Sequence, residues 1–282
     1  MAKVNRDVLI PLMDTYRSYL EKQKRDANAR PLSNIYEDYK RDIAKRAKMH
    51  LATESWTESQ IGDGTIGSHV IKAVQNNRNL VGRFQVSGFI DKVKENIPVS
   101  ERLLYDLYHE RKDQECFERI CRQYGRKYDL VAYLYFIIDP QMYLPLRSSV
   151  FDKVFHKIGV NLQTTAQCSW VNYQEFIDTV ADVRDAMKEY YNDDTLDLLD
   201  AHSFLWTLNL DSFKSNLKSI PDKEIETEER IPENENDVVF HKDYGKGFIV
   251  KYTDKNVYVD FDGKQLIFPY PEAFDKGYLT NK

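Results

Sequence analysis

The chain has 282 residues, of which 42% are hydrophobic and 30% are charged, and its formal net charge is −5. This length favours one large body with a small second domain, and the composition is typical of a folded protein rather than a disordered one. The sequence has no apolar run of the roughly 18 residues that a membrane-spanning helix needs, and its first residues lack the apolar stretch of a signal peptide. We therefore expect a cytoplasmic protein with no membrane partner.

Charge is unevenly distributed along the chain. Residues 1–50 contain twelve Lys or Arg against seven Asp or Glu, whereas Pro221–Asp237 contains eight acidic residues against Lys223 and Arg230. The basic first segment is the part that an anionic partner would meet first. The acidic stretch has few hydrophobic residues to bury, which is typical of a linker.

Apolar residues at spacings of three and four predict a succession of helices in the first 210 residues. In chain order, the expected helices cover residues 4–24, 33–49, 70–75, 101–111, 116–124, 130–138, 148–158, 170–187 and 196–208. Ser33, Ser100 and Ser169 are placed to cap three of these helices, and Gly125 and Gly159 to end two others. Residues 133–138 are apolar all round, so we expect them at the centre of the body, either as a helix or as a short buried strand.

The second predicted helix has two different faces. Its core-facing residues are expected to be Ile35, Tyr39, Ile43 and Met49. The other face carries five basic residues, Lys40, Arg41, Lys45, Arg46 and Lys48. Such a face is either simply solvated or a contact surface for nucleic acid. After this helix, Thr53–Gly67 contains three glycines and is predicted to be a surface loop.

The sequence pattern changes after residue 237 to short runs of β-branched and aromatic residues, 238–240, 248–250, 257–261 and 266–268. Gly-rich and Asp-Gly connections between them signal hairpins. Four or five short strands in so few residues must close on themselves to bury a core, which predicts a small SH3-like β-barrel. The expected fold is therefore multidomain and mainly α, with a helical domain over 1–210, an acidic linker over 211–236 and the barrel over 237–282.

The first predicted hairpin has the distinctive sequence His241-Lys242-Asp243-Tyr244-Gly245-Lys246-Gly247, and Val257-Tyr258-Val259-Asp260-Phe261 follows it. These residues resemble the Tudor or SH3-like C-terminal module of UvrD/PcrA-type DNA helicases. Such modules are adaptors to polymerase or nucleic acid, so the resemblance implies docking rather than catalysis.

The segments Tyr143–Arg147 and Leu199–Trp206 belong to a second resemblance, which covers the helical body. They are similar to parts of uncharacterised bacterial proteins that accompany restriction systems or HNH nucleases. The chain has no H-N-H spacing itself, so this resemblance implies the helical region without the nuclease.

No catalytic constellation stands out in the sequence. The six histidines form no HxxxH or HxH pair, and Cys116, Cys121 and Cys168 have no CxxC spacing, so we expect buried thiols and no metal. Asp200, His202 and Ser203 are of the types that nucleophilic catalysis uses, but neighbours on one helix do not project toward one another, which favours a cap or core role. No GxxxxGK[ST] sequence occurs, and no cofactor is expected. An activity assembled from distant residues, with His202 among them, stays open.

The candidate nucleic-acid-binding residues are basic or aromatic: Lys40, Arg41, Lys45 and Arg46 in the second helix, and His241, Lys242, Tyr244, Lys246 and Lys251 in the first hairpin. Lysine and arginine side chains neutralise phosphates, which gives binding that is sensitive to salt and largely independent of sequence. We expect a nonenzymatic protein of a bacterial defence or mobile-element system that docks on DNA or on a DNA-bound protein. The alternative is a protein-binding regulator or inhibitor that docks through the barrel and the acidic linker.

Overall fold

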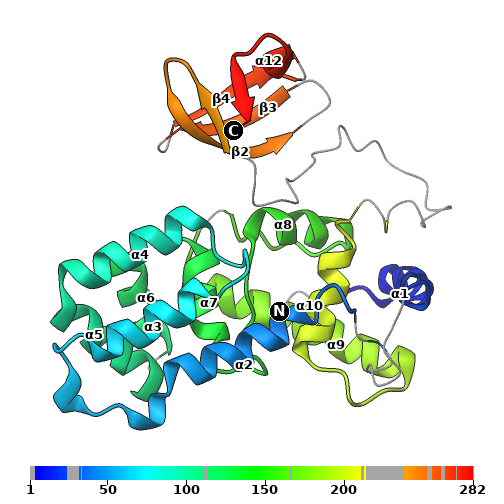
Figure 1. Cartoon of the computed structure of the whole chain (residues 1–282). Helices are drawn as coiled ribbons and strands as arrows, with labels where there is room; N and C mark the ends of the chain where they lie inside the picture. The colour runs from blue at the N-terminus through cyan, green and yellow to red at the C-terminus, as the bar shows by residue number, and fades with distance from the viewer. Residues whose placement is uncertain are drawn as a thin grey trace. The chain divides into compact units, whose positions relative to one another are not determined.

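The structure is a computed structural model, and the chain divides into two units, Met1–Lys218 and Ser219–Lys282. The first unit is helical and the second is a curled antiparallel sheet (Figure 1), which confirms the mainly α fold and the change to strands after residue 237. The structure describes residues 4–23, 32, 34–110, 113–165, 167–210, 213, 238–252, 256–261, 264–270 and 272–281. The linker predicted over 211–236 lies outside these residues, except for Phe213.

The helices of the first unit follow the order of the chain. They are α1 (Arg6–Glu21), α2 (Tyr39–Leu51), α3 (Thr65–Gln75), α4 (Arg83–Glu95), α5 (Ile97–Tyr105), α6 (Asp113–Tyr124), α7 (Tyr128–Phe136), α8 (Ser148–Lys157), α9 (Trp170–Tyr191) and α10 (Leu198–Thr207). Two short 3₁₀ helices, Thr53–Ser55 and Glu58–Gln60, lie between α2 and α3, and a π-helical turn, Asp106–Glu110, continues α5. Within the described ranges, none of the helices combines the length and the apolar content that crossing a membrane requires.

Several helix boundaries lie where the sequence predicts them. The side chain of Ser169 accepts a hydrogen bond from the backbone N–H of Asn172 and so caps the start of α9. Gly125 and Gly159 follow α6 and α8 with φ angles of +102° and +75°, a conformation that glycine adopts without a steric penalty.

Helix α7 lies in the middle of the helical unit (Figure 1). Every residue from Leu130 to Phe136 is buried, so the segment is apolar all round as expected and is a helix rather than a strand. The buried hydroxyl of Tyr133 donates to the carbonyl oxygen of Ala73 in α3, 2.9 Å away, which satisfies the only polar group of that side chain.

Several helices differ from the predictions. Helix α3 begins at Thr65, within the segment predicted to be a loop and five residues before the predicted start. Ser33, the predicted cap of the second helix, lies outside the described residues. Helix α2 begins at Tyr39, because residues 35–38 form turns.

Helix α5 begins at Ile97, because Asn96 accepts from the backbone N–H of Val99 at 3.3 Å and takes the capping role expected of Ser100. Helix α4 has no counterpart among the predicted helices; only Phe89 and Val93 are buried in it, so its apolar stripe is too narrow to stand out in the sequence.

The loop predicted over Thr53–Gly67 is organised by one buried carboxylate. The side chain of Glu101 in α5 is fully buried and accepts backbone N–H groups of Gly62 at 2.6 Å, Gly64 at 3.2 Å and Gly67 at 2.8 Å. Gly62 and Gly64 have φ angles of +104° and +92°. A Cβ atom on Gly67 would lie 2.9 Å from Val93, so this close approach requires glycine.

The second unit is a five-stranded antiparallel sheet with the order β4-β3-β2-β1-β5. Its elements are β1 (Val238–His241), β2 (Gly245–Tyr252), β3 (Asn256–Phe261), β4 (Lys264–Pro269), the short helix α12 (Glu272–Asp275) and β5 (Leu279–Asn281). Strand β3 alternates between buried and half-buried residues, with Val257, Val259 and Phe261 in the core. Because β5 returns to pair with β1, the sheet curls around this core.

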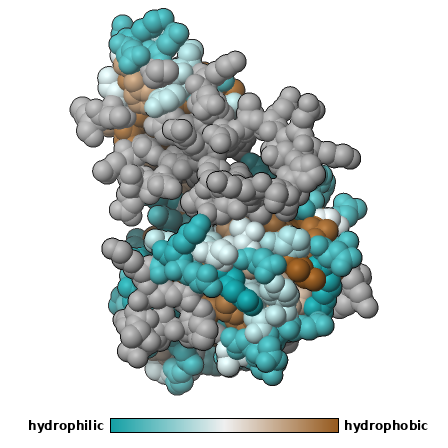
Figure 2. All heavy atoms as spheres, turned by 90° about the vertical axis from the view of Figure 1, so that its right-hand side faces the viewer, coloured by the Kyte–Doolittle hydropathy of each residue, from teal (hydrophilic) through white to brown (hydrophobic). Residues whose placement is uncertain are grey.

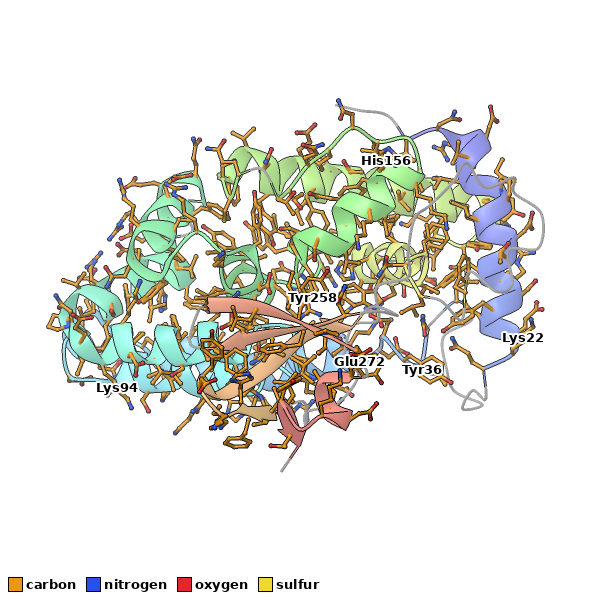
Figure 3. All side chains as sticks on the ribbon, turned by 90° about the horizontal axis from the view of Figure 1, so that it is seen from above. Lys22, Tyr36, Lys94, His156, Tyr258 and Glu272 are labelled. Atoms are coloured by element: carbon orange, nitrogen blue, oxygen red, sulfur yellow. The ribbon has the colours of Figure 1, made fainter. Side chains whose placement is uncertain are left out.

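The surface of the helical unit is mainly hydrophilic on the side that Figure 2 shows. Its exposed large hydrophobic residues belong to different elements: Ile10, Tyr36, Met49, Phe84, Val99, Met142 and Val171. Lys22, after α1, and Lys94, in α4, lie at opposite ends of this unit (Figure 3).

Replacing Glu101 with alanine should lower the free energy of unfolding by about 3 kcal/mol, because three backbone N–H groups lose a charged acceptor in a buried site. Chemical denaturation measures this change. Glu95→Ala is the matched control, since Glu95 is exposed on the neighbouring α4. A loss no larger than that of the control would contradict the role of Glu101 in holding the loop.

Candidate functional site

Lys40 does not belong to the exposed basic face on which the sequence placed it. Its side chain is only 2% exposed, and its ammonium group forms an ion pair with the buried carboxylate of Glu37. The same nitrogen lies 3.2 Å from Nδ1 of His202 and 5.1 Å from the centre of the Trp206 ring. Burial lowers the pKa of Lys40, and Glu37 acts in the opposite direction. The structure therefore places Lys40, predicted to contact phosphates, in the core of the helical unit.

Arg41 is half-buried and already bound to two carboxylates. Its guanidinium group donates two hydrogen bonds to Asp197, at 2.6 and 2.8 Å, and one to Asp200 at 2.8 Å. Although burial lowers the pKa of Arg41, the hydrogen bonds to Asp197 and the charge of Asp200 raise it overall. This arrangement joins α2 to the start of α10, so Arg41 acts as a link between helices.

Two predicted residues of α2 remain exposed, Lys45 and Arg46. Arg46 donates to the backbone carbonyl of Asp42 at 3.3 Å, which leaves most of its guanidinium edge facing solvent. Met49, expected in the core, is 64% exposed. The buried stripe of α2 instead consists of Lys40, Ile43, Ala44, Ala47 and Leu51.

His202 occupies the core position that the sequence favoured for it. Its Nε2 lies 2.9 Å from the carbonyl oxygen of Pro145, so this nitrogen carries the proton and Nδ1 accepts from Lys40. Burial, and next the Lys40 ammonium, lower the pKa of His202 well below its ordinary value. Both ring nitrogens are thus engaged in structural hydrogen bonds.

The predicted residues of the sheet lie around the β1–β2 turn. Lys242, Tyr244 and Lys246 are exposed there, and His241 is half-buried. His241 pairs with Gly245 across the turn, and its Nδ1 accepts from the backbone N–H of Asp243 at 3.1 Å. Lys251 lies in β2, with its side chain outside the described residues.

Four rings gather beside this turn, His241, Tyr244, Phe261 and Phe268, and we call them the hairpin aromatic cluster. The ring centre of His241 is 4.8 Å from that of Tyr244 and 5.2 Å from that of Phe268. The Tyr244 ring is 5.5 Å from Phe261, which is buried. Tyr244 is 46% exposed, which makes it the most exposed member of the cluster.

Gly247 allows the cluster to form. A Cβ atom at this position would lie 2.6 Å from the ring of Phe261 and 2.7 Å from Val259, distances that no side chain tolerates. The sequence singled out the two ends of the Gly245-x-Gly247 segment only as turn residues. Phe261 and Phe268 were not predicted as site residues. The sequence feature that could have indicated them is their position in strands whose alternate side chains face the core.

Two exposed lysines belong to the same hairpin as the cluster, and Lys246 is one residue away from Gly247, so its side chain lies on the face of β2 opposite to the one that Phe261 covers. The Nζ atom of Lys246 lies 5.2 Å from the centre of the Phe248 ring, in a cation–π contact. Lys242 is exposed on the other arm of the turn. The hairpin therefore combines an exposed aromatic ring with two exposed lysines, a combination suited to binding.

Within the described parts of the chain, no group of three or more His, Cys, Asp or Glu residues is placed to hold a metal ion. Comparison of the chain with protein-family models, with curated proteins and with solved structures found no match in any of the three.

Replacing Lys40 with methionine should lower the free energy of unfolding by about 3 kcal/mol, because Glu37 is left as a buried charge without its ion-pair partner. The double variant Glu37→Gln/Lys40→Met should recover most of that loss. Lys45→Met, on the exposed face, is the control and should change stability by less than about 0.5 kcal/mol. Denaturant titration measures all three, and equal effects at positions 40 and 45 would contradict the buried ion pair.

The stability of the protein should fall as the pH drops below about 6.5, the ordinary pKa of histidine. The folded state keeps His202 neutral, because its pKa is lowered, while the unfolded state takes up the proton. This contribution reaches about 1.4 kcal/mol per pH unit at most. His202→Gln should reduce the slope of unfolding free energy against pH, whereas His156→Gln, at the exposed His156 of α8 (Figure 3), should not. An unchanged slope in His202→Gln would count against this assignment.

Proposed function

We propose that this chain is a nonenzymatic docking protein that binds nucleic acid through the hairpin aromatic cluster of its C-terminal sheet. The observation that carries the proposal is the exposed ring of Tyr244, which packs against His241 and Phe261 and lies in the same hairpin as the exposed Lys242 and Lys246. Aromatic rings stack with the bases of single-stranded nucleic acid, and nearby cations neutralise its phosphates.

Single-stranded DNA suits this site better than a duplex. A ring can stack only on a base whose face is open, and the bases of a duplex are already stacked on one another. With only two exposed lysines in the hairpin, the number of neutralised phosphates is small, so affinity should be moderate and should fall only gently with salt. Lys45 and Arg46 of α2 are a separate exposed basic pair that contributes through phosphate contacts alone.

The sheet itself is proposed to be an SH3-like barrel of the adaptor type. Strands β1 to β4 are neighbours in sequential order, β5 returns beside β1, and the short helix α12 joins β4 to β5. In this order β4 and β5 are the two edges, so the arrangement supports a small half-closed barrel. The setting in a bacterial defence or mobile-element system stays a prediction.

A second candidate is docking of a protein at the edge strand β4. In the strand order, β4 is a terminal strand, and its Ile267 is 60% exposed. An exposed edge can accept an added strand from another protein, and an apolar side chain beside it adds to the contact. This favours the protein-binding regulator as the alternative.

Fluorescence anisotropy should show that the full chain binds a labelled single-stranded oligonucleotide. It should bind a duplex of the same sequence with lower affinity. Tyr244→Ala should weaken binding of the single strand about tenfold, the value of one lost stacking contact. The double variant Lys242→Ala/Lys246→Ala should lower the slope of log affinity against log salt concentration by about 1.4, since two phosphate contacts are lost.

Lys276→Ala is the matched control for these variants, because Lys276 is an exposed lysine of the same unit that pairs with Glu272. Equal affinity of the Tyr244→Ala variant and the parent chain would contradict docking at the hairpin aromatic cluster. Absence of binding to either nucleic acid at low salt would leave the β4 edge as the better candidate.

A further inference from the structure

Two thiols that are distant in the sequence meet in the helical unit. Cys121 lies in α6, Cys168 directly precedes the Ser169 cap of α9, and their sulfur atoms are 3.9 Å apart. Both are reduced, and so is the third cysteine, Cys116, which is buried in α6. Neither thiol belongs to the hairpin aromatic cluster or to the group of residues around Lys40.

The segment that carries Cys168 is held in place on both sides. The hydroxyl of Tyr128 lies 2.9 Å from the carbonyl oxygen of Gln167 and 3.0 Å from that of Ser169, and it accepts from the Ser169 N–H. Arg126 donates to the carbonyl oxygen of Cys168 at 3.0 Å and to Glu118 at 2.8 Å. These contacts keep the two thiols side by side.

We propose that Cys121 and Cys168 are a reversible oxidation site, at which a peroxide converts the two thiols into a disulfide. The sulfur of Cys121 attacks one oxygen of hydrogen peroxide, so that an S–O bond forms, the O–O bond breaks and one water leaves after proton transfer. The sulfur of Cys168 then attacks the Cys121 sulfenic acid and releases a second water. Both sulfurs are oxidised and both peroxide oxygens are reduced.

The geometry suits this chemistry. A disulfide requires a sulfur–sulfur distance of about 2.0 Å, so the two atoms must approach by roughly 2 Å. Cys168 lies outside any helix, where the rotation of its side chain is less restricted than in α6. Cys168 is also partly exposed, which gives a small oxidant access to the pair.

The order of attack follows from the hydrogen bond between the thiols. That bond lowers the pKa of Cys121 and raises the pKa of Cys168, and Arg126 adds to the effect on Cys121. The lowered pKa gives Cys121 more of the thiolate character that attack on a peroxide needs.

The new bond would join α6 directly to the start of α9. These helices already pack through Phe117, whose ring centre is 5.7 Å from that of Trp170 and 5.8 Å from that of Tyr173. A crosslink across 47 positions removes conformational freedom from the unfolded chain, so the oxidised protein should melt at a temperature several degrees higher.

The test treats the folded full chain with hydrogen peroxide, blocks remaining thiols by alkylation and maps the tryptic peptides by mass spectrometry. Arg119 lies between Cys116 and Cys121, so trypsin places each cysteine in a different peptide. We expect the Cys121 and Cys168 peptides to be joined, with Cys116 alkylated. Reducing agent should reverse both the crosslink and the rise in melting temperature.

The variants make the result specific. Cys116→Ser should crosslink like the parent chain, whereas Cys121→Ser and Cys168→Ser should neither crosslink nor gain melting temperature, with folding checked by circular dichroism. In Cys168→Ser, a 1,3-dione that traps sulfenic acids should label Cys121. A folded parent chain that forms no Cys121–Cys168 crosslink, or that joins Cys116 equally well, would overturn the proposal.

Discussion

The buried ammonium group of Lys40 is the constraint around which one side of the helical unit is arranged. A charge in the core is tolerated only when other groups compensate it, and here Glu37, His202 and the Trp206 ring all face the same nitrogen. Two of these three residues come from α10, so the contacts with Lys40 fix the position of α10 relative to α2. Arg41 holds the two helices in the same relative position through its ion pairs with Asp197 and Asp200.

The sequence predicted most helices and strands because their boundaries depend on local features. Serine caps, glycine ends and alternating β-strand residues act within a few positions of the chain, as Ser169, Gly125 and Val257 illustrate. Helix α4 escaped prediction because only Phe89 and Val93 are buried in it. The capping residue of α5 was misplaced because both Asn96 and Ser100 are of capping type, and only the fold selects Asn96.

The candidate site was harder to predict than the fold. Lys40 looks like its exposed neighbours by residue type, but it lies three and four positions before Ile43 and Ala44 and so shares their buried face. Glu37 pairs with it from only three positions away, but its second partner, His202, is 162 positions away and could not be found locally. In the sheet, the lysines of the turn were recognised by charge, whereas Phe261 and Phe268 join the hairpin aromatic cluster only through strand pairing.

The close approach of Phe261 to Gly247 shows that the hairpin has two kinds of residue: buried ones that determine its shape, and exposed ones that do not. The glycine and the buried ring determine the shape of the hairpin, and almost any change at either would be felt throughout the core of the sheet. Tyr244, by contrast, lies in the β1–β2 turn and exposes nearly half of its surface to solvent. Mutation can therefore explore new partner preferences at position 244 while the scaffold stays intact, which makes this hairpin an evolvable element and a practical starting point for redesign.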